Sequence, residues 1–342
     1  MGFLKYFTLV LTLFALNSCE NNDRENTPDV SNIDVTVHVD RFEQDLFGMD
    51  TLRLTEETDR MNVKYPELFP LFTETIIHDQ TNPKETPEMA LSGFLRSPRI
   101  RQLKDTVQQV YGNIAPLEKE LNQLFRYYKY YFPEKPTPRV ATIISEFGVD
   151  AFTCGDQLCG IGLDMFLGEN YPGYSPDIFP AYLRRQFNDK YISVRLAKAL
   201  VQNTFGETPP GKSLLDMMLY NGKMLYMVKK LLPGTPDSMI MGYTNEQMEG
   251  CVANEQAVWA RILDQKLLYS TDFGEFRKLV TPSPNAPVVF QEAPGEVGNW
   301  IGWQIVKSWV KRNQGASMKE LISQTDSQKF LETARYKPQQ LN

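Results

Sequence analysis

Two residues on one predicted helix have the spacing of a catalytic metal site. Asp216 and Tyr220 lie four positions apart, on one face of the helix that apolar periodicity predicts over residues 213–232. Zinc peptidases use this spacing in H-E-x-x-H, where both histidines bind the metal and the glutamate deprotonates the metal-bound water. Here Asp216, Met217 and Tyr220 occupy the three positions. The zinc ligands and the general base are therefore missing together, and we predict no bound metal and no other cofactor.

Glu255 is the second acidic candidate, on the next long predicted helix. If it faced Asp216 across the helix pair, the two carboxylates could do acid/base chemistry once burial separated their pKa values. The alternative is structural: Asp216 caps its helix, Tyr220 is a packed aromatic, and Glu255 is a solvated or helix-paired acid. The two histidines of the chain, His38 and His78, lie outside this region, which argues against histidine-based mechanisms.

Glycines and tryptophans form a third candidate site, within residues 294–309. The glycines do not form G-x-G-x-x-G, so a phosphate cradle is not predicted. Gly302, like Gly222 on the first helix, is expected where another backbone approaches closely. Trp300 and Trp303 are candidates for lining a sugar- or peptide-binding groove.

Two of the four cysteines are candidates for a disulfide. Cys154 and Cys159 bracket a predicted turn between two extended segments, and in an oxidising compartment we expect them to form a disulfide. The alternative is two small buried residues. Their C-x4-C spacing is not that of a thioredoxin-like site, and Cys251 is most simply a buried free thiol.

The first residues are a targeting signal. Residues 1–18 combine Lys5 with a short apolar run and end before Cys19 in Leu-Asn-Ser-Cys, which resembles a bacterial lipobox. The apolar run is too short for a stop-transfer helix. We predict a lipoprotein signal peptide over residues 1–18, a lipidated Cys19, and a flexible polar tether over residues 19–32. The alternatives are a secreted protein cleaved nearby or an inner hydrophobic N-terminus.

Composition and charge limit the classes of binding partner. The chain has 342 residues with 36 Lys and Arg against 42 Asp and Glu, a formal net charge of −6. A net acid is poorly suited to bind nucleic acid or an anionic membrane surface, so contact with the membrane is expected through the lipid anchor alone. The length and the 42% hydrophobic residues are enough for a buried core.

Hydrophobic periodicity predicts one α+β domain over residues 33–342. Alternation predicts a strand at 33–40, and β-rich segments at 140–147 and 158–167 are expected to be neighbouring strands. The predicted amphipathic helices lie at 100–110 and 117–132, and after residue 180 at 182–201, 213–232, 246–268 and 299–311. Ser213-x-x-Asp216 and Thr244-x-x-Gln247 match N-terminal capping boxes. The fold class is therefore a small sheet with a helical majority.

The mature chain resembles the gliding-motility lipoprotein GldB family of Bacteroidetes. The resemblance rests on Cys19 and on these ordered motifs: Tyr65-Pro66 with Phe69 and Phe72, Tyr130 to Pro133, Leu163 to Gly168, Tyr220 to Lys223, Leu231 to Pro233, Asn254-Glu255, Tyr269 to Asp272, Pro294-Gly295, Trp300 to Val306, and Tyr336 to Pro338. It implies an envelope lipoprotein associated with gliding machinery or, in non-gliding relatives, with a related envelope process. It also implies a body similar to zincin metallopeptidases.

Two departures weaken a catalytic interpretation. Met217 stands where family members commonly carry an acid, and Glu296 stands in a segment that is often basic. The favoured hypothesis is a noncatalytic zincin-like lipoprotein that binds an envelope protein or peptide through the former peptidase cleft, with gliding or secretion machinery as the candidate partner. Its anchor is expected in the outer rather than the inner membrane, and Gly222, Lys223, Trp300 and Trp303 are the candidate binding residues. The alternative is a hydrolase of envelope peptide or glycan that uses Asp216 and Glu255.

Overall fold

A computed structural model describes residues 27–339 apart from 83 and 207. The predicted signal peptide and the lipidation site at Cys19 lie outside the described residues. The end of the predicted tether is described, and Val30 within it is buried. The packed body therefore begins a few residues earlier than the sequence pattern indicates.

One four-stranded sheet forms the centre of the fold. Its strands are β1 (Val39–Asp40), β2 (Arg139–Ile143), β3 (Ala151–Cys154) and β4 (Leu158–Gly162). They lie in the order β1-β2-β4-β3, with β1, β2 and β4 parallel and β3 antiparallel to β4. The two segments predicted as neighbouring strands are indeed neighbours, but β3, which lies between them in the sequence, makes the hairpin with β4.

The strand predicted at residues 33–40 pairs only at its end. Its alternation is real, because Val37 and Val39 are buried while their neighbours face outward. However, the backbone amides of Val37 and Val39 donate to Asn122 Oδ1 (2.8 Å) and Glu118 Oε1 (3.0 Å). Side chains of a helix thus replace a neighbouring strand, which periodicity alone does not reveal.

Helices surround the sheet, and several agree with the predicted segments. Two of the first six match the amphipathic segments that periodicity predicted, namely α5 and α6. The helices of this half are α1 (Phe42–Phe47), α2 (Leu54–Lys64), α3 (Leu68–Leu71), which continues into a π-helical turn (Phe72–Ile76), α4 (Pro87–Arg96), α5 (Pro98–Val110) and α6 (Ala115–Tyr131).

The second half of the described chain is helical, as predicted. Both predicted capping boxes are present at the starts of α9 and α11. The segment predicted as one helix over 246–268 is divided at Asn254 into α11 and α12. The helices are α7 (Ala181–Arg184), α8 (Ile192–Phe205), α9 (Leu214–Leu231), α10 (Asp237–Met241), α11 (Asn245–Ala253), α12 (Glu255–Asp264), α13 (Phe273–Val280), α14 (Val297–Arg312), α15 (Met318–Ser323) and α16 (Ser327–Ala334).

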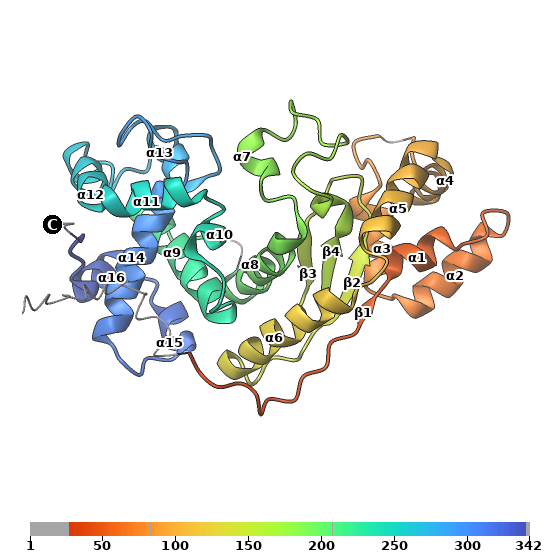
Figure 1. Ribbon diagram of the computed structural model, residues 1–342, viewed down its shortest axis with the longest axis horizontal. Helices are drawn as coiled ribbons and strands as arrows, with labels where there is room; N and C mark the ends of the chain where they lie inside the picture. Colours follow the sequence, from red (N-terminus) through yellow and green to blue (C-terminus); the bar gives the residue numbers. More distant parts are fainter. Residues whose placement is uncertain (1–26, 83, 207, 340–342) are drawn as a thin grey trace, which may run out of the picture.

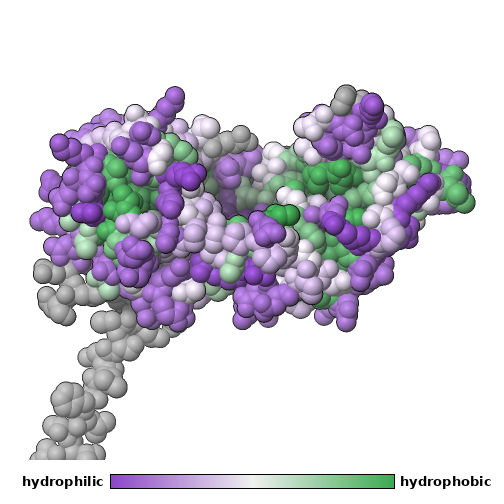
Figure 2. All heavy atoms as spheres, turned by 90° about the horizontal axis from the view of Figure 1, so that it is seen from above, coloured by the Kyte–Doolittle hydropathy of each residue, from purple (hydrophilic) through white to green (hydrophobic). Residues whose placement is uncertain are grey.

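The two halves stand side by side, with α8 between them (Figure 1). The sheet and helices α1 to α6 form one side, and α9 to α16 form the other. Helix α8 packs against β3 and β4 and also against α9, so it belongs to both sides. Seen from above, the molecule is hollowed where the two sides meet (Figure 2). The architecture confirms the predicted class, a small sheet with a helical majority.

Candidate functional site

A cavity lined by both apolar and charged side chains lies where the two halves meet. It has a volume of about 260 Å³ and is lined from β3, α8, α9, α10 and the start of α14. A second cavity of about 110 Å³ adjoins it and shares Arg195, Lys198, Met241 and Glu296 with it. We call the two together the central cleft. Because its walls come from both halves, only the folded chain assembles it.

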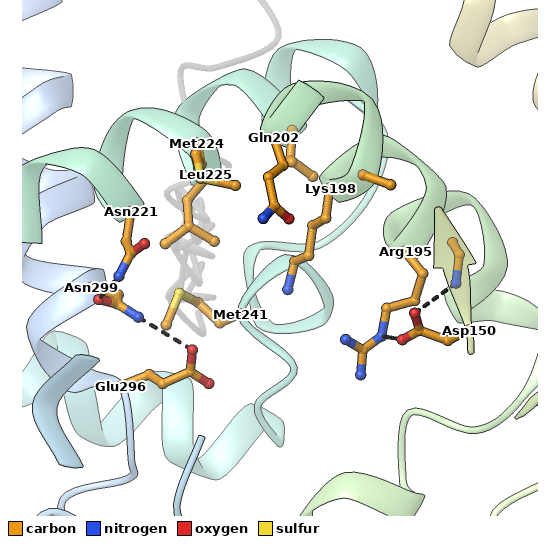
Figure 3. A pocket seen from close by; sticks show the side chains of 13 residues that line it. Asp150, Arg195, Lys198, Gln202, Asn221, Met224, Leu225, Met241, Glu296 and Asn299 are labelled. Carbon is orange, nitrogen blue, oxygen red and sulfur yellow. Dashed lines mark hydrogen bonds and ion pairs between the residues drawn. The ribbon is translucent and has the colours of Figure 1, made fainter. Parts of the chain in front are cut away.

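Helix α8 supplies two cations to the cleft. Arg195 and Lys198 lie three residues apart and therefore on one face of the helix, and both point into the cavity (Figure 3). Arg195 Nε lies 3.3 Å from Asp150 Oδ2. Lys198 makes no hydrogen bond or ion pair with any other residue that the structure describes. Its pKa is lowered to about 8, because burial and the neighbouring Arg195 both disfavour the ammonium ion.

An amide network holds Glu296 on the opposite wall. Asn221 of α9 donates to Asn299 Oδ1 (2.8 Å), and Asn299 Nδ2 in turn lies 3.2 Å from Glu296 Oε1 (Figure 3). Burial raises the pKa of Glu296, while Lys198 and Arg195 partly oppose this shift. Glu296 also has a φ of +66°, in the left-handed region that a residue with a side chain rarely adopts. Such backbone strain is often concentrated at functional sites.

Arg185 lines the second cavity without a counter-charge of its own. Its Nε is buried and has no hydrogen-bond partner among the described residues. Burial lowers its pKa from the ordinary value. The nearby loop is firmly held, because Tyr243 donates to the carbonyl oxygen of Gly295 (2.6 Å). The cleft thus combines a rigid rim with charged groups whose hydrogen-bonding capacity is not filled.

The structure gives Asp216 and Tyr220 structural partners. Asp216 Oδ2 accepts hydrogen bonds from the backbone amide (2.9 Å) and hydroxyl (2.6 Å) of Ser213, and it completes the capping box of α9. The Tyr220 hydroxyl donates to the carbonyl oxygen of Gly206. Neither residue lines the central cleft. The non-catalytic interpretation of both residues agrees with these contacts.

Glu255 is buried and lines neither cavity of the central cleft. It is 5% exposed and accepts a hydrogen bond of 2.7 Å from the Tyr336 hydroxyl. No hydrogen bond joins Glu255 to Asp216 among the residues described. The carboxylate of Glu255 is therefore engaged by Tyr336, near the end of the described chain.

Gly222 and Lys223 contribute to packing. A Cβ on Gly222 would lie 2.3 Å from the carbonyl carbon of Gly302 on α14, so the two helices meet backbone to backbone, as predicted. Lys223 is 6% exposed, donates to the carbonyl oxygen of Gln324 and lies 4.6 Å from the centre of the Phe330 ring. It therefore faces the C-terminal helices and not the cleft. The residue of this motif that faces the cleft is their neighbour Asn221.

The tryptophans require a correction. Trp300 is 3% exposed and Trp303 is fully buried, so neither lines a groove. Both lie on α14, whose close approach to α9 encloses them in the core. The Trp303 ring is covered by Lys307, whose Nζ lies 4.4 Å from its centre. Aromatic clustering in the sequence marked a packed helix, not a binding surface.

The predicted disulfide also requires a correction. Cys154 and Cys159 are both free thiols in the structure. The hairpin register pairs Cys154 with Leu158 and Thr153 with Cys159, so the two cysteines face opposite sides of the sheet. Their closeness in sequence is therefore not enough for a bond. Cys251 is a buried free thiol, as predicted.

The zinc that a zincin-like body implies does not fit the residues present. Within residues 27–339, leaving out 83 and 207, no three His, Cys, Asp or Glu side chains are grouped so that they could hold a metal. The helix positions corresponding to the motif are Asp216, which is engaged in a cap, Met217, and Tyr220, which is bonded to a carbonyl. The side chains at the motif positions therefore do not provide the ligands of a zincin-type zinc site.

The fold and the cleft define a mostly helical α+β protein with a cleft between its two halves that charged side chains help to line. By sequence, residues 23–338 match the family of the gliding motility protein GldB, and the chain belongs to this family. The resemblance found in the motifs is thus confirmed. No curated protein and no solved structure matches the chain. Across the described residues, the helices are too short or too polar to cross a membrane.

The sequence indicated the cleft only in part. Asn221 lies inside a motif that carried the family resemblance, Asn299 directly precedes another, and Glu296 is one of the two departures from the family pattern. Arg185, Arg195 and Lys198 were missed. Two of these share one face of a predicted helix, which is the single local signal that could have found them.

Proposed function

We propose that this chain is a noncatalytic envelope lipoprotein of the gliding type, anchored through Cys19, which binds a peptide segment of an envelope partner in the central cleft. The observation that carries the proposal is the cleft itself, which lies between the two halves and presents cations without full partners. Concave sites with a few convergent polar groups are where proteins bind ligands. The anchor is proposed for the outer membrane. The zincin-like relationship stays a prediction.

The contacts of Asp216 and Glu255 bear on the hydrolase alternative. Asp216 accepts a hydrogen bond from Ser213 and Glu255 accepts one from Tyr336, so each acid has a structural hydrogen-bond partner. Acid/base catalysis needs two groups that reach one substrate. The contacts of both acids therefore support the binding proposal.

The test fills the cavity and leaves the rest of the surface unchanged. Ala199 lines the larger cavity from α8, whereas Ala257 is exposed on α12. In cells that lack their own copy, Ala199→Phe should abolish gliding and the recovery of a cross-linked partner, and the control Ala257→Phe should keep both. Circular dichroism and membrane fractionation confirm that both variants are folded and delivered.

The same cells test the alternative that the protein is a hydrolase. Asp216→Asn and Glu255→Gln should keep gliding in proportion to the folded protein present. A peptidase or glycan hydrolase activity of the purified full chain that is lost in either variant would contradict the noncatalytic proposal. So would normal gliding by a folded Ala199→Phe variant.

The anchor has its own test. Cys19→Ala should release the protein from membrane fractions into the soluble envelope fraction, because the multiple acyl chains of a lipoprotein are then absent. Separation of inner and outer membranes assigns the location of the unaltered chain. Full retention of the variant on membranes would show that the lipobox is not the anchor.

A further inference from the structure

The charges that line the central cleft do not balance. Its cations are Arg185, Arg195 and Lys198, and its carboxylates are Asp150 and Glu296. Arg195 is paired with Asp150 at 3.3 Å, and Lys198 and Glu296 attract one another across the cavity. Arg185 is left with no carboxylate partner among the residues described. One positive charge is therefore uncompensated.

This excess charge is costly where it lies. Arg185 Nε is shielded from solvent and donates no hydrogen bond to a described residue, while the side chain as a whole is half-buried. A buried donor without an acceptor loses its hydration and gains nothing in return. A lysine in such a place can lose its proton, but a guanidinium stays charged. An arginine in this position calls for an anion from outside the chain.

The size and charge of the site narrow the choice of anion. The two cavities, of about 260 and 110 Å³, admit a chain end or a side chain and not a folded surface. A guanidinium binds carboxylate and phosphate in a two-pronged geometry. A carboxylate carries one negative charge, matching the excess, whereas phosphate carries about two.

We infer that Arg185, assisted by Arg195 and Lys198, binds a carboxylate group of the partner peptide. The inference rests on the proposed function in that it assumes a peptide ligand. Gln186, Gln247 and Ser283 line the same cavity and offer donors and acceptors to the peptide backbone beside the carboxylate. The carboxylate belongs to an acidic side chain or to a chain terminus.

Binding of short synthetic peptides to the full chain in detergent tests the inference. The probes are a blocked tripeptide with a central glutamate, the same peptide with glutamine, and an all-alanine tripeptide with a free C-terminal carboxylate. Calorimetry measures the affinity of each peptide for the unaltered chain and for the Arg185→Gln variant. Arg184→Gln is the matched control, because Arg184, the last residue of α7, also has a buried Nε without a hydrogen-bond partner among the described residues but lines neither cavity.

We expect the unaltered chain to bind at least one acidic probe and to bind the glutamine peptide at least about tenfold more weakly. Arg185→Gln should weaken the acidic probe by a similar factor, and Arg184→Gln should not. Binding of the blocked glutamate peptide would show that a side chain supplies the carboxylate, and binding of the all-alanine peptide would show that a chain terminus supplies it.

Other results would overturn the inference. These are equal binding of the glutamate and glutamine peptides, no saturable binding of either acidic probe, or equal binding by Arg185→Gln. Tighter binding of inorganic phosphate, lost in Arg185→Gln, would replace carboxylate by phosphate. If the acidic probes fail while Ala199→Phe still abolishes capture of the partner, the proposed function stands and only the carboxylate assignment falls.

Discussion

Asp164 is completely buried beneath the turn that joins β2 to β3. Its carboxylate oxygens accept hydrogen bonds from the backbone amides of Ser145 (3.1 Å) and Phe147 (2.6 Å). Glu146 and Phe147 both have positive φ values, 58° and 69°, so this turn needs support from outside. Burial raises the pKa of Asp164 to about 6, and the two amides oppose that shift. At neutral pH the group is ionised and accepts both bonds.

We predict that Asp164→Ala destabilises the chain. Two amides lose their acceptor, at about 1–3 kcal/mol each, and relief of the buried charge offsets part of this. The expected net loss in the free energy of unfolding is about 2 kcal/mol at pH 7. Urea unfolding measures it, with the exposed Glu169→Ala as the control. An unchanged midpoint of urea unfolding for Asp164→Ala would show that the turn is stable without the two hydrogen bonds to Asp164.

The buried Lys223 makes the stability of the folded chain depend on pH. Burial lowers its pKa from 10.5 to about 8. Between these values the unfolded chain binds more protons than the folded chain, so stability rises as pH increases from 8 to 10. Below pH 8 the folded chain must keep a buried ammonium ion, held by the Gln324 carbonyl and the Phe330 ring.

We therefore predict that the unaltered chain gains stability relative to Lys223→Met as the pH is raised. The expected gain between pH 7 and 10 is up to about 3 kcal/mol. Chemical unfolding at several pH values gives the difference, and the exposed Lys319→Met should show no such trend. A constant difference for Lys223→Met would mean that its ammonium is not disfavoured in the folded chain.

At the level of elements, the contact between α9 and α14 depends on two glycines. A Cβ on Gly302 would lie 1.9 Å from the carbonyl oxygen of Met218, and one on Gly222 would meet the backbone of Gly302. Backbone cannot move aside as a flexible side chain can. The helices would have to separate, and Asn221 and Asn299, which bridge them at the wall of the cleft, would separate with them.

We predict that Gly302→Ala lowers the free energy of unfolding by about 3 kcal/mol through overpacking. The control is Gly250→Ala on α11, where a Cβ would meet nothing within 4 Å. That variant should be stabilised by up to about 1 kcal/mol, since alanine favours helix more than glycine does. Thermal unfolding of the pair checks the prediction. Equal effects of the two substitutions would show that helix propensity outweighs packing here.

Sequence periodicity predicted the elements better than it predicted the site. Helices α5, α6, α9 and α14 follow apolar spacing that tertiary contacts do not override. The length of the strand predicted at 33–40 was overestimated, because alternation in the sequence indicates which side chains are buried and not which backbone groups pair with another strand. The cleft draws Asp150, Arg195, Asn221 and Glu296 from four distant segments. No local motif encodes that convergence.

At the scale of the whole molecule, the C-terminal segment is fastened to the body. After α16, Tyr336 reaches α12, where its hydroxyl donates to Glu255 and its ring meets Trp259 edge to face, with the ring centres 5.4 Å apart. Burial and the neighbouring Glu255 carboxylate both raise the pKa of Tyr336, so the phenol keeps its proton and remains the donor. Glu255 therefore serves to hold the end of the chain, which is a structural reason for an acid at that position.

We predict that Tyr336→Phe loosens this end without unfolding the sheet. The ring contact with Trp259 remains, but the buried Glu255 carboxylate loses its donor, which costs about 1–3 kcal/mol. Hydrogen exchange should become faster in α12 and α16 and stay unchanged in β2 and β4. Combining Tyr336→Phe with Glu255→Gln should cost less than the sum of the single changes, because both break one hydrogen bond. Additive losses would mean that the hydroxyl and the carboxylate act independently, and that Glu255 has a partner or a task other than Tyr336.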